Sequence, residues 1–188
     1  MSPSERWPAL FVELANEQGV SLALGRIIAK TGWTTAELIH AIDESQESLE
    51  SLMPWRLVSL LIGVNNQYRG YAIDLYHKEM LQLVHRAIEF AGGEVRHVVV
   101  LSIPDYGVTP FGKSCGKENI TSEIRMYNAV ARDICKEAGV EFVDVTECSL
   151  KAQTDSSLLT EDRLHYSGKM HMEWAQLVLE RLRSMSLI

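Results

Sequence analysis

Short apolar runs alternate with longer amphipathic segments along this chain. Continuous apolar runs closed by glycine or proline are typical of strands in a parallel sheet, and residues spaced by three or four are typical of helices. The expected strands are Arg26–Lys30, Leu57–Ile62, His97–Ile103 and Val140–Val145. The expected helices are Pro8–Gln18, a segment opened by Thr34, Thr35 and Glu37 with Thr34 as N-cap, Ile73–Ala91, Ser122–Ala138 and Gly168–Arg183.

The alternation of strands with helices predicts βαβ units and a parallel sheet in an α/β fold. Ligands bind such sheets at the carboxyl ends of the strands. The residues just after the expected strands are Gly32, the pair Gly63 and Asn65, and Pro104–Asp105. A chain of 188 residues, 46% of them hydrophobic, suits a single domain over residues 1–188.

The composition of the chain argues against several classes of protein. The net charge of −7 disfavours a nucleic-acid partner, which needs a basic face. No apolar run is long enough to span a membrane. The three cysteines, Cys115, Cys135 and Cys148, form no CxxC pair, which suits a reducing, cytoplasmic compartment. No clustered histidines suggest a metal site.

The candidate chemistry lies in an Asp-x-x-His pattern, Asp162 and His165, in the polar loop before the last expected helix. Residues three apart in a turn can face the same way. A carboxylate on one imidazole nitrogen fixes the tautomer and leaves the other nitrogen as a general base. The same short pattern also occurs by chance in surface loops.

A second pattern follows the expected strand Leu57–Ile62. It is Gly63-Val64-Asn65-Asn66-Gln67-Tyr68-Arg69-Gly70, in which the Asn65 amide can donate a hydrogen bond to an oxyanion. Gly32 can offer a backbone N–H to the same anion. Alternatively, both glycines only end strands, and Asn65 and Asn66 form a turn.

Together these patterns resemble the SGNH (GDSL-like) hydrolase family. Lys30–Thr35 resembles the block with the oxyanion glycine, Gly63-x-Asn65 the block with the oxyanion asparagine, and Asp162-x-x-His165 the block with the triad acid and base. Leu61–Gly70 and Leu101–Phe111 also look familial.

The resemblance implies a three-layer α/β/α sandwich with a flavodoxin-like parallel sheet. It implies a serine-type ester hydrolase, an esterase, lipase or deacylase working through an acyl-enzyme. His165 would be base and then acid, Asp162 would orient it, and Gly32 and Asn65 would stabilise the oxyanion. It implies no metal or organic cofactor, and a small ester or an acylated sugar or lipid as substrate. The oligomeric state is left open.

The chain departs from the family in its first block, a strand ending in Gly-Asp-Ser that carries the nucleophile. No such block occurs here, and neither Ser2 nor Ser4 follows a strand. We therefore expect no nucleophile in this chain, a truncated or misplaced start at Met1, and a sheet lacking its first strand. The resemblance places that strand between Arg26–Lys30 and Leu57–Ile62.

Three alternatives remain. A noncatalytic binding domain could keep the pocket without the nucleophile. Gly107–Ser114 formally matches the P-loop pattern of nucleotide-binding proteins, although no expected strand runs directly into it. Gly112–Gly116 fits the Gly-x-Ser-x-Gly nucleophile elbow around Ser114, but it lies beyond a strand end.

Overall fold

The computed structural model describes residues 2–187 and divides into two compact units. We call Ile27–Ile103 together with Glu123–Asp144 the sheet unit. The terminal unit comprises Met1–Arg26, Pro104–Ser122 and Val145–Ile188. Each unit is built from segments that are distant in sequence.

The sheet unit contains a three-stranded parallel sheet in the order β1-β2-β3. Its strands are β1 (Val58–Leu60), β2 (Val98–Leu101) and β3 (Glu141–Val143). The register pairs Val58 with Val98, and Val99 with Glu141. All four residues of β2 are buried because this strand has a neighbour on each side, whereas Ser59 on the edge strand β1 is exposed.

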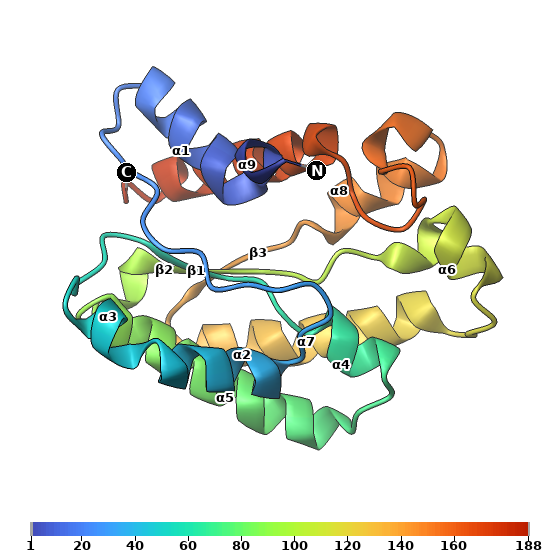
Figure 1. Ribbon diagram of the computed structural model, residues 1–188, viewed down its shortest axis with the longest axis horizontal. Helices are drawn as coiled ribbons and strands as arrows, with labels where there is room; N and C mark the ends of the chain where they lie inside the picture. Colours follow the sequence, from blue (N-terminus) through green and yellow to red (C-terminus); the bar gives the residue numbers. More distant parts are fainter. Residues whose placement is uncertain (1, 188) are drawn as a thin grey trace. The chain divides into compact units, whose positions relative to one another are not determined.

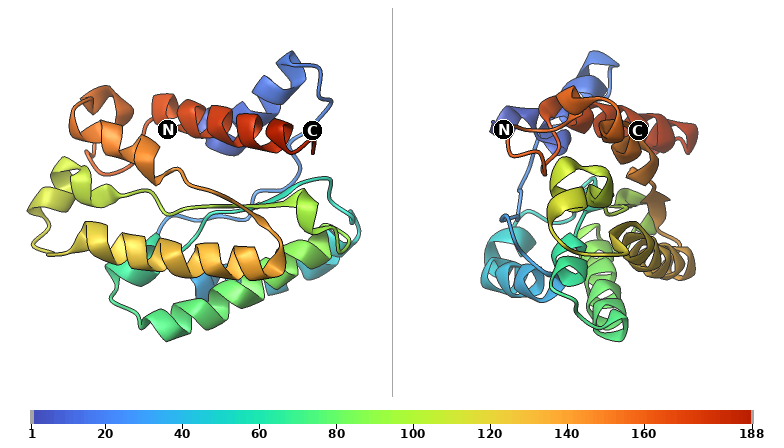
Figure 2. Two further views of the ribbon diagram at one scale, coloured as in Figure 1. Left: turned by 180° about the vertical axis from the view of Figure 1, so that it is seen from behind. Right: turned by 90° about the vertical axis from the view of Figure 1, so that its right-hand side faces the viewer.

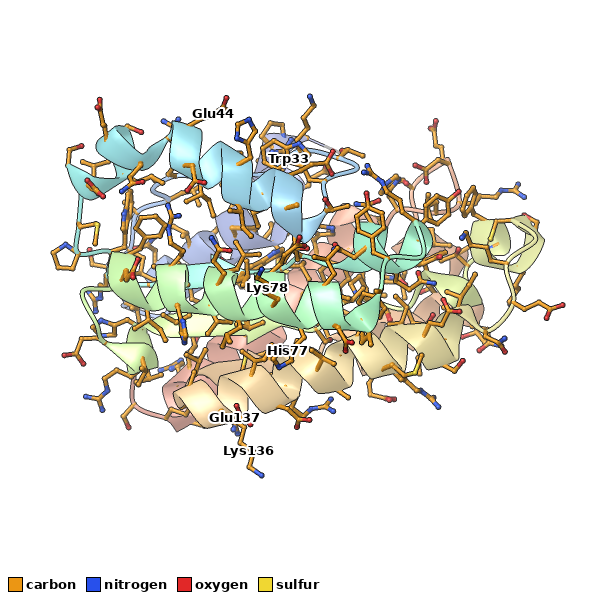
Figure 3. All side chains as sticks on the ribbon, turned by 90° about the horizontal axis from the view of Figure 1, so that it is seen from below. Trp33, Glu44, His77, Lys78, Lys136 and Glu137 are labelled. Atoms are coloured by element: carbon orange, nitrogen blue, oxygen red, sulfur yellow. The ribbon has the colours of Figure 1, made fainter. Side chains whose placement is uncertain are left out.

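Helices of the sheet unit cover one face of this sheet (Figure 1). They are α2 (Thr35–Glu44), α3 (Gln46–Glu50), α4 (Val64–Tyr68), α5 (Ile73–Phe90) and most of α7 (Ile120–Ala138). The buried face of α5 carries Tyr76, Met80, Leu83, Val84 and Ala87, at the helical spacing that makes a core-facing stripe. Seen from the helix side, the exposed side chains of Glu44, His77, Lys78 and Lys136 come from three neighbouring helices, α2, α5 and α7 (Figure 3).

The terminal unit is built around two helices that lie side by side, α1 (Trp7–Glu17) and α9 (Gly168–Ser184) (Figure 2). The shorter helices α6 (Pro110–Ser114) and α8 (Thr146–Leu150) belong to the same unit. The contact between α1 and α9 includes a hydrogen bond from the Trp7 N–H to His171 Nδ1 at 3.0 Å. His171 is therefore a packing residue between the two helices.

The expected α/β class with a parallel sheet is confirmed. The longer helices agree with the periodicity to within two residues at each end, and Thr34 caps α2 with a capping box to Glu37. Among the described residues, no helix is long and apolar enough to cross a membrane.

The expected strand at Arg26–Lys30 is wrong. The segment is irregular and mostly exposed, and it pairs with no strand. Its two large apolar residues, Ile27 and Ile28, are too few to bury a strand on both faces. The strand expected at Leu57–Ile62 is shorter in the structure, Val58–Leu60, and its Ser59 is exposed.

Candidate active site

The loop that precedes α9 is closed on itself by backbone hydrogen bonds. Leu159 and Tyr166 form an antiparallel bridge, and the Thr160 N–H donates to the His165 carbonyl at 2.8 Å. Between them the chain turns tightly, with Arg163 at a φ of 57°. This closure fixes the backbone on both sides of Asp162 and His165.

Asp162 and His165 are brought into direct contact. Oδ2 of Asp162 lies 2.6 Å from Nδ1 of His165, which is a short charge-assisted hydrogen bond. The other oxygen, Oδ1, accepts the backbone N–H groups of Leu164 and His165, both at 2.9 Å, and the Thr160 hydroxyl at 2.7 Å. The structure gives Nε2 of His165 no partner among the described residues.

The surroundings of Asp162 favour its ionised form. Partial burial acts to raise its pKa, but the hydrogen bonds from His165, Leu164 and Thr160 hold the pKa well below the usual range for aspartate. A carboxylate that stays ionised favours a proton on Nδ1 of His165. Nε2 is then the unprotonated nitrogen, available as a base.

The residue after His165 anchors this loop in the terminal unit. The buried Tyr166 hydroxyl donates to the carbonyl of Asp105 at 2.8 Å, and its ring packs edge-on against Trp174 with 5.3 Å between centroids. The Asp105 N–H in turn donates to the Ser149 hydroxyl at 2.9 Å. This buried network limits how far the loop can move.

Gly32 and Asn65 are also brought together, within the sheet unit. The Asn65 amide Nδ2 donates to the carbonyl of Trp33, next to Gly32, at 2.9 Å. An amide group carries two N–H bonds, so one remains for another acceptor. The Gly32 N–H has no partner among the described residues, and Gly32 adopts a φ of +91°, which favours glycine.

Asn65 and Asn66 both lie in the helix α4, so the alternative that they form a simple turn is wrong. Gly63 is the N-cap, with a φ of 123°. A Cβ at this position would lie 2.8 Å from both Ile103 Cδ1 and Tyr76 Cε2. Only glycine therefore lets the chain turn from β1 into α4 and set the position of Asn65.

A buried polar network beside Asn65 was not predicted from the sequence. The Thr35 N–H donates to Asn66 Oδ1 at 3.0 Å, and Asn66 Nδ2 donates to the Thr35 hydroxyl at 2.6 Å. The Thr35 hydroxyl itself donates to Glu79. The hydrogen bond from the Thr160 hydroxyl to Asp162 was also not predicted. A threonine two residues before an aspartate in a turn is the signal that could have indicated it.

The four predicted site residues are thus placed in two pairs, Asp162 with His165 in the terminal unit and Gly32 with Asn65 in the sheet unit. Each pair has a free hydrogen-bonding group. The first pair offers an acceptor, Nε2 of His165. The second pair offers two donors, the Gly32 N–H and the second N–H of the Asn65 amide.

Ser2, Ser4 and Ser114, which the sequence raised as nucleophiles, and Ser102 at the end of β2 lack the required setting. Ser2 and Ser4 contact each other at 2.9 Å beside a 3₁₀ turn and follow no strand. Ser102 comes directly after β2, but it is buried and donates to Asp144 at 3.0 Å. Ser114 ends α6 and donates to the carbonyl of Pro110, so the nucleophile-elbow alternative is wrong.

The P-loop alternative is also wrong. Gly107 lies in a 3₁₀ turn, separated from β2, and Lys113 lies in the last turn of α6. A phosphate cradle needs a strand entering the first glycine and a helix that begins at the lysine. Among the described residues, no group of three histidine, cysteine or acidic side chains could hold a metal ion.

Comparison with protein-family models identifies one family, and comparison with solved structures identifies one fold. A model of the GDSL-like lipase/acylhydrolase family matches residues 2–172. No curated protein matches this chain.

Solved structures with the same fold include three hydrolases. The psychrotrophic esterase EstA from Pseudoalteromonas sp. has a TM-score of 0.70 at 16% identity, covering 98% of this chain and 90% of that one. A lipase/acylhydrolase from Enterococcus faecalis has a TM-score of 0.68 at 15% identity, covering 98% and 87%. The acetylxylan esterase Axe2 from Geobacillus stearothermophilus has a TM-score of 0.68 at 20% identity, covering 94% and 80%.

Proposed function

The chain belongs to the GDSL-like lipase/acylhydrolase family, and from this premise we propose that it works as a serine-type ester hydrolase through an acyl-enzyme. The observation that carries the proposal is the 2.6 Å contact between Asp162 Oδ2 and His165 Nδ1, with Nε2 left free. An imidazole oriented in this way can take a proton from an attacking hydroxyl and return it to the leaving group.

In this proposal the two pairs have complementary roles. His165 is the general base and then the general acid, and Asp162 orients it and stabilises the imidazolium. The Gly32 N–H and the second N–H of the Asn65 amide donate to the oxyanion of the tetrahedral intermediate. The unengaged state of these donors supports the assignment. No step requires a metal or an organic cofactor.

We propose that the attacking serine is not among the serines of this chain. A nucleophile must lie within hydrogen-bond reach of its base. Ser102, the serine that directly follows a described strand, is buried and bonded to Asp144. Loss of a triad nucleophile costs on the order of 10⁶ in kcat. The chain alone is therefore expected to hydrolyse esters on the order of 10⁶-fold more slowly than an enzyme with its nucleophile in place.

The proposed substrates are small esters, including acylated sugars or lipids. Support comes from the fold that the chain shares with an acetylxylan esterase and with a lipase/acylhydrolase. Acetyl esters are the first compounds to test, because a small acyl group makes the fewest demands on the shape of the pocket.

Hydrolysis of p-nitrophenyl acetate tests the proposal. The assay compares this chain with a longer product in which a strand segment ending in Gly-Asp-Ser is fused before Ser2, each as wild type and as His165→Ala. We expect the longer product to be active, its activity to be abolished by His165→Ala, and the short chain to be inert.

Inactivity of both products would contradict the enzyme proposal and favour a noncatalytic binding domain. Activity of the short chain that depends on His165 would retain the hydrolase and overturn the statement that the nucleophile is absent. Activity that survives His165→Ala would remove the central role of the imidazole.

A further inference from the structure

Arg69 holds the turn that contains Gly32. Its Nη2 donates to the carbonyl of Gly32 at 2.7 Å, and its Nη1 lies 3.3 Å from Oε2 of Glu37. Arg69 is the C-cap residue of α4 and follows Asn65 by four positions, so the two side chains lie on the same side of the helix, one turn apart.

The two side chains bind consecutive carbonyl groups. Arg69 binds the carbonyl of Gly32, and Asn65 binds that of Trp33 at 2.9 Å. Both peptide oxygens of the turn are thus directed toward α4. The orientation of this turn relative to α4 is set by two hydrogen bonds rather than one.

The second partner of Arg69 is itself fixed. Oε2 of Glu37 accepts the Thr34 N–H at 2.7 Å and the Thr34 hydroxyl at 2.9 Å, which closes the capping box at the start of α2. Arg69 therefore connects the end of α4, the start of α2 and the turn between residues 31 and 33. A lysine could not make both contacts with the same planar geometry.

Packing alone does not hold the turn at Gly32. A Cβ built on Gly32 has no atom within 4 Å, and the neighbouring Thr31 is exposed. The hydrogen bond from Trp33 N–H to the Lys30 carbonyl is long, at 3.2 Å. Few other contacts are therefore available to keep the Gly32 N–H in one direction if the guanidinium is removed.

We propose that Arg69 is a positioning residue for the oxyanion donors: it fixes the Gly32 turn against α4, so that the Gly32 N–H and the Asn65 amide are presented together. Only the catalytic consequence of this proposal rests on the proposed function. The structural part, that Arg69 orders the turn, stands independently of any activity.

The test uses Arg69→Gln and Arg69→Lys, with Arg132→Gln as the matched control. Arg132 is an exposed arginine of the same unit, is paired with Asp144 at 2.7 Å, and has no contact with the turn. The first measurement is amide hydrogen exchange of Trp33 by NMR. The second is kcat and KM for p-nitrophenyl acetate in the active product.

We expect the Trp33 amide to exchange at least about fivefold faster in Arg69→Gln, and at an unchanged rate in Arg132→Gln. Loss of the Arg69 hydrogen bond removes one of the two side-chain hydrogen bonds that hold the turn. We expect kcat to fall at least about tenfold with KM within about twofold, because displacement of oxyanion donors weakens the transition state more than the ground state. For Arg69→Lys, the exchange rate and kcat should both lie between those of the wild type and those of Arg69→Gln.

Unchanged Trp33 exchange in Arg69→Gln would overturn the proposal, whatever the activity. Faster exchange with unchanged kcat in an active enzyme would overturn the positioning of the oxyanion donors. Faster exchange in a product without any His165-dependent activity would confirm that Arg69 orders the turn and would count against the proposed function instead.

Discussion

Acidification should weaken the terminal unit through His171. Nδ1 of this histidine accepts the Trp7 N–H at 3.0 Å, and its ring packs against Trp174 with 4.7 Å between centroids. An imidazolium carries hydrogen on both nitrogens and cannot accept that bond. Burial lowers the pKa of His171 to about 4, helped by the nearby Arg6 and opposed by Glu5.

The sign and size of the effect follow from the difference between the folded and unfolded pKa values. Between the folded value of about 4 and the ordinary value of 6.5, the unfolded chain binds a proton at His171 that the folded chain does not. Stability therefore falls as the pH decreases through this window. From pH 7 to pH 5 the loss from this one group is about 2 kcal/mol, at 1.36 kcal/mol for each pH unit.

Urea unfolding at pH 7, 6 and 5 measures this contribution, with His171→Asn as the comparison. The asparagine oxygen can replace Nδ1 as acceptor for the Trp7 N–H but does not titrate. The wild type should lose about 2 kcal/mol more than the variant over this range. Equal losses in the two proteins would refute the assignment, because other titrating groups contribute to both.

Two pairs of substitutions test the packing at single positions. Gly112→Ala would place a Cβ 2.1 Å from the carbonyl oxygen of Tyr106, so thermal unfolding should show a loss of about 3 kcal/mol in the free energy of unfolding. Gly116→Ala, in open space at a φ of +74°, should lower it by only about 1 kcal/mol. Among the described residues the buried Tyr76 hydroxyl has no hydrogen-bond partner, so Tyr76→Phe should leave stability unchanged or raise it by about 1 kcal/mol. Tyr127→Phe, which loses a 2.6 Å hydrogen bond, should lower it by about 1 kcal/mol. Similar losses for the two tyrosine variants would contradict this view of the core.

The parts of the structure that depend on local pattern could be predicted from the sequence. Val98–Leu101 is apolar throughout and becomes the central strand, and Thr34 with Glu37 is a complete capping box. The contact between Asp162 and His165 was predictable because the two residues are three apart in one turn. In each case the partners lie within a few residues of one another.

The parts that depend on distant partners could not be predicted. Ile27 and Ile28 suggest a strand, but a strand needs a neighbour to pair with, and the segment has none among the described residues. Arg69 contacts Gly32, which lies 37 positions earlier in the chain, and Glu37, which lies 32 positions earlier. The local sequence carries no signal for such contacts until the fold is known.

The tautomer of His165 tests the central claim, that Asp162 orients this imidazole with Nε2 free. A long-range ¹H–¹⁵N correlation spectrum at neutral pH distinguishes the two nitrogens. We predict a proton on Nδ1 and a bare Nε2 in the wild type, with loss of this preference in Asp162→Asn. A wild-type imidazole protonated on Nε2 alone, or one whose tautomers are unaffected by Asp162→Asn, would contradict the account.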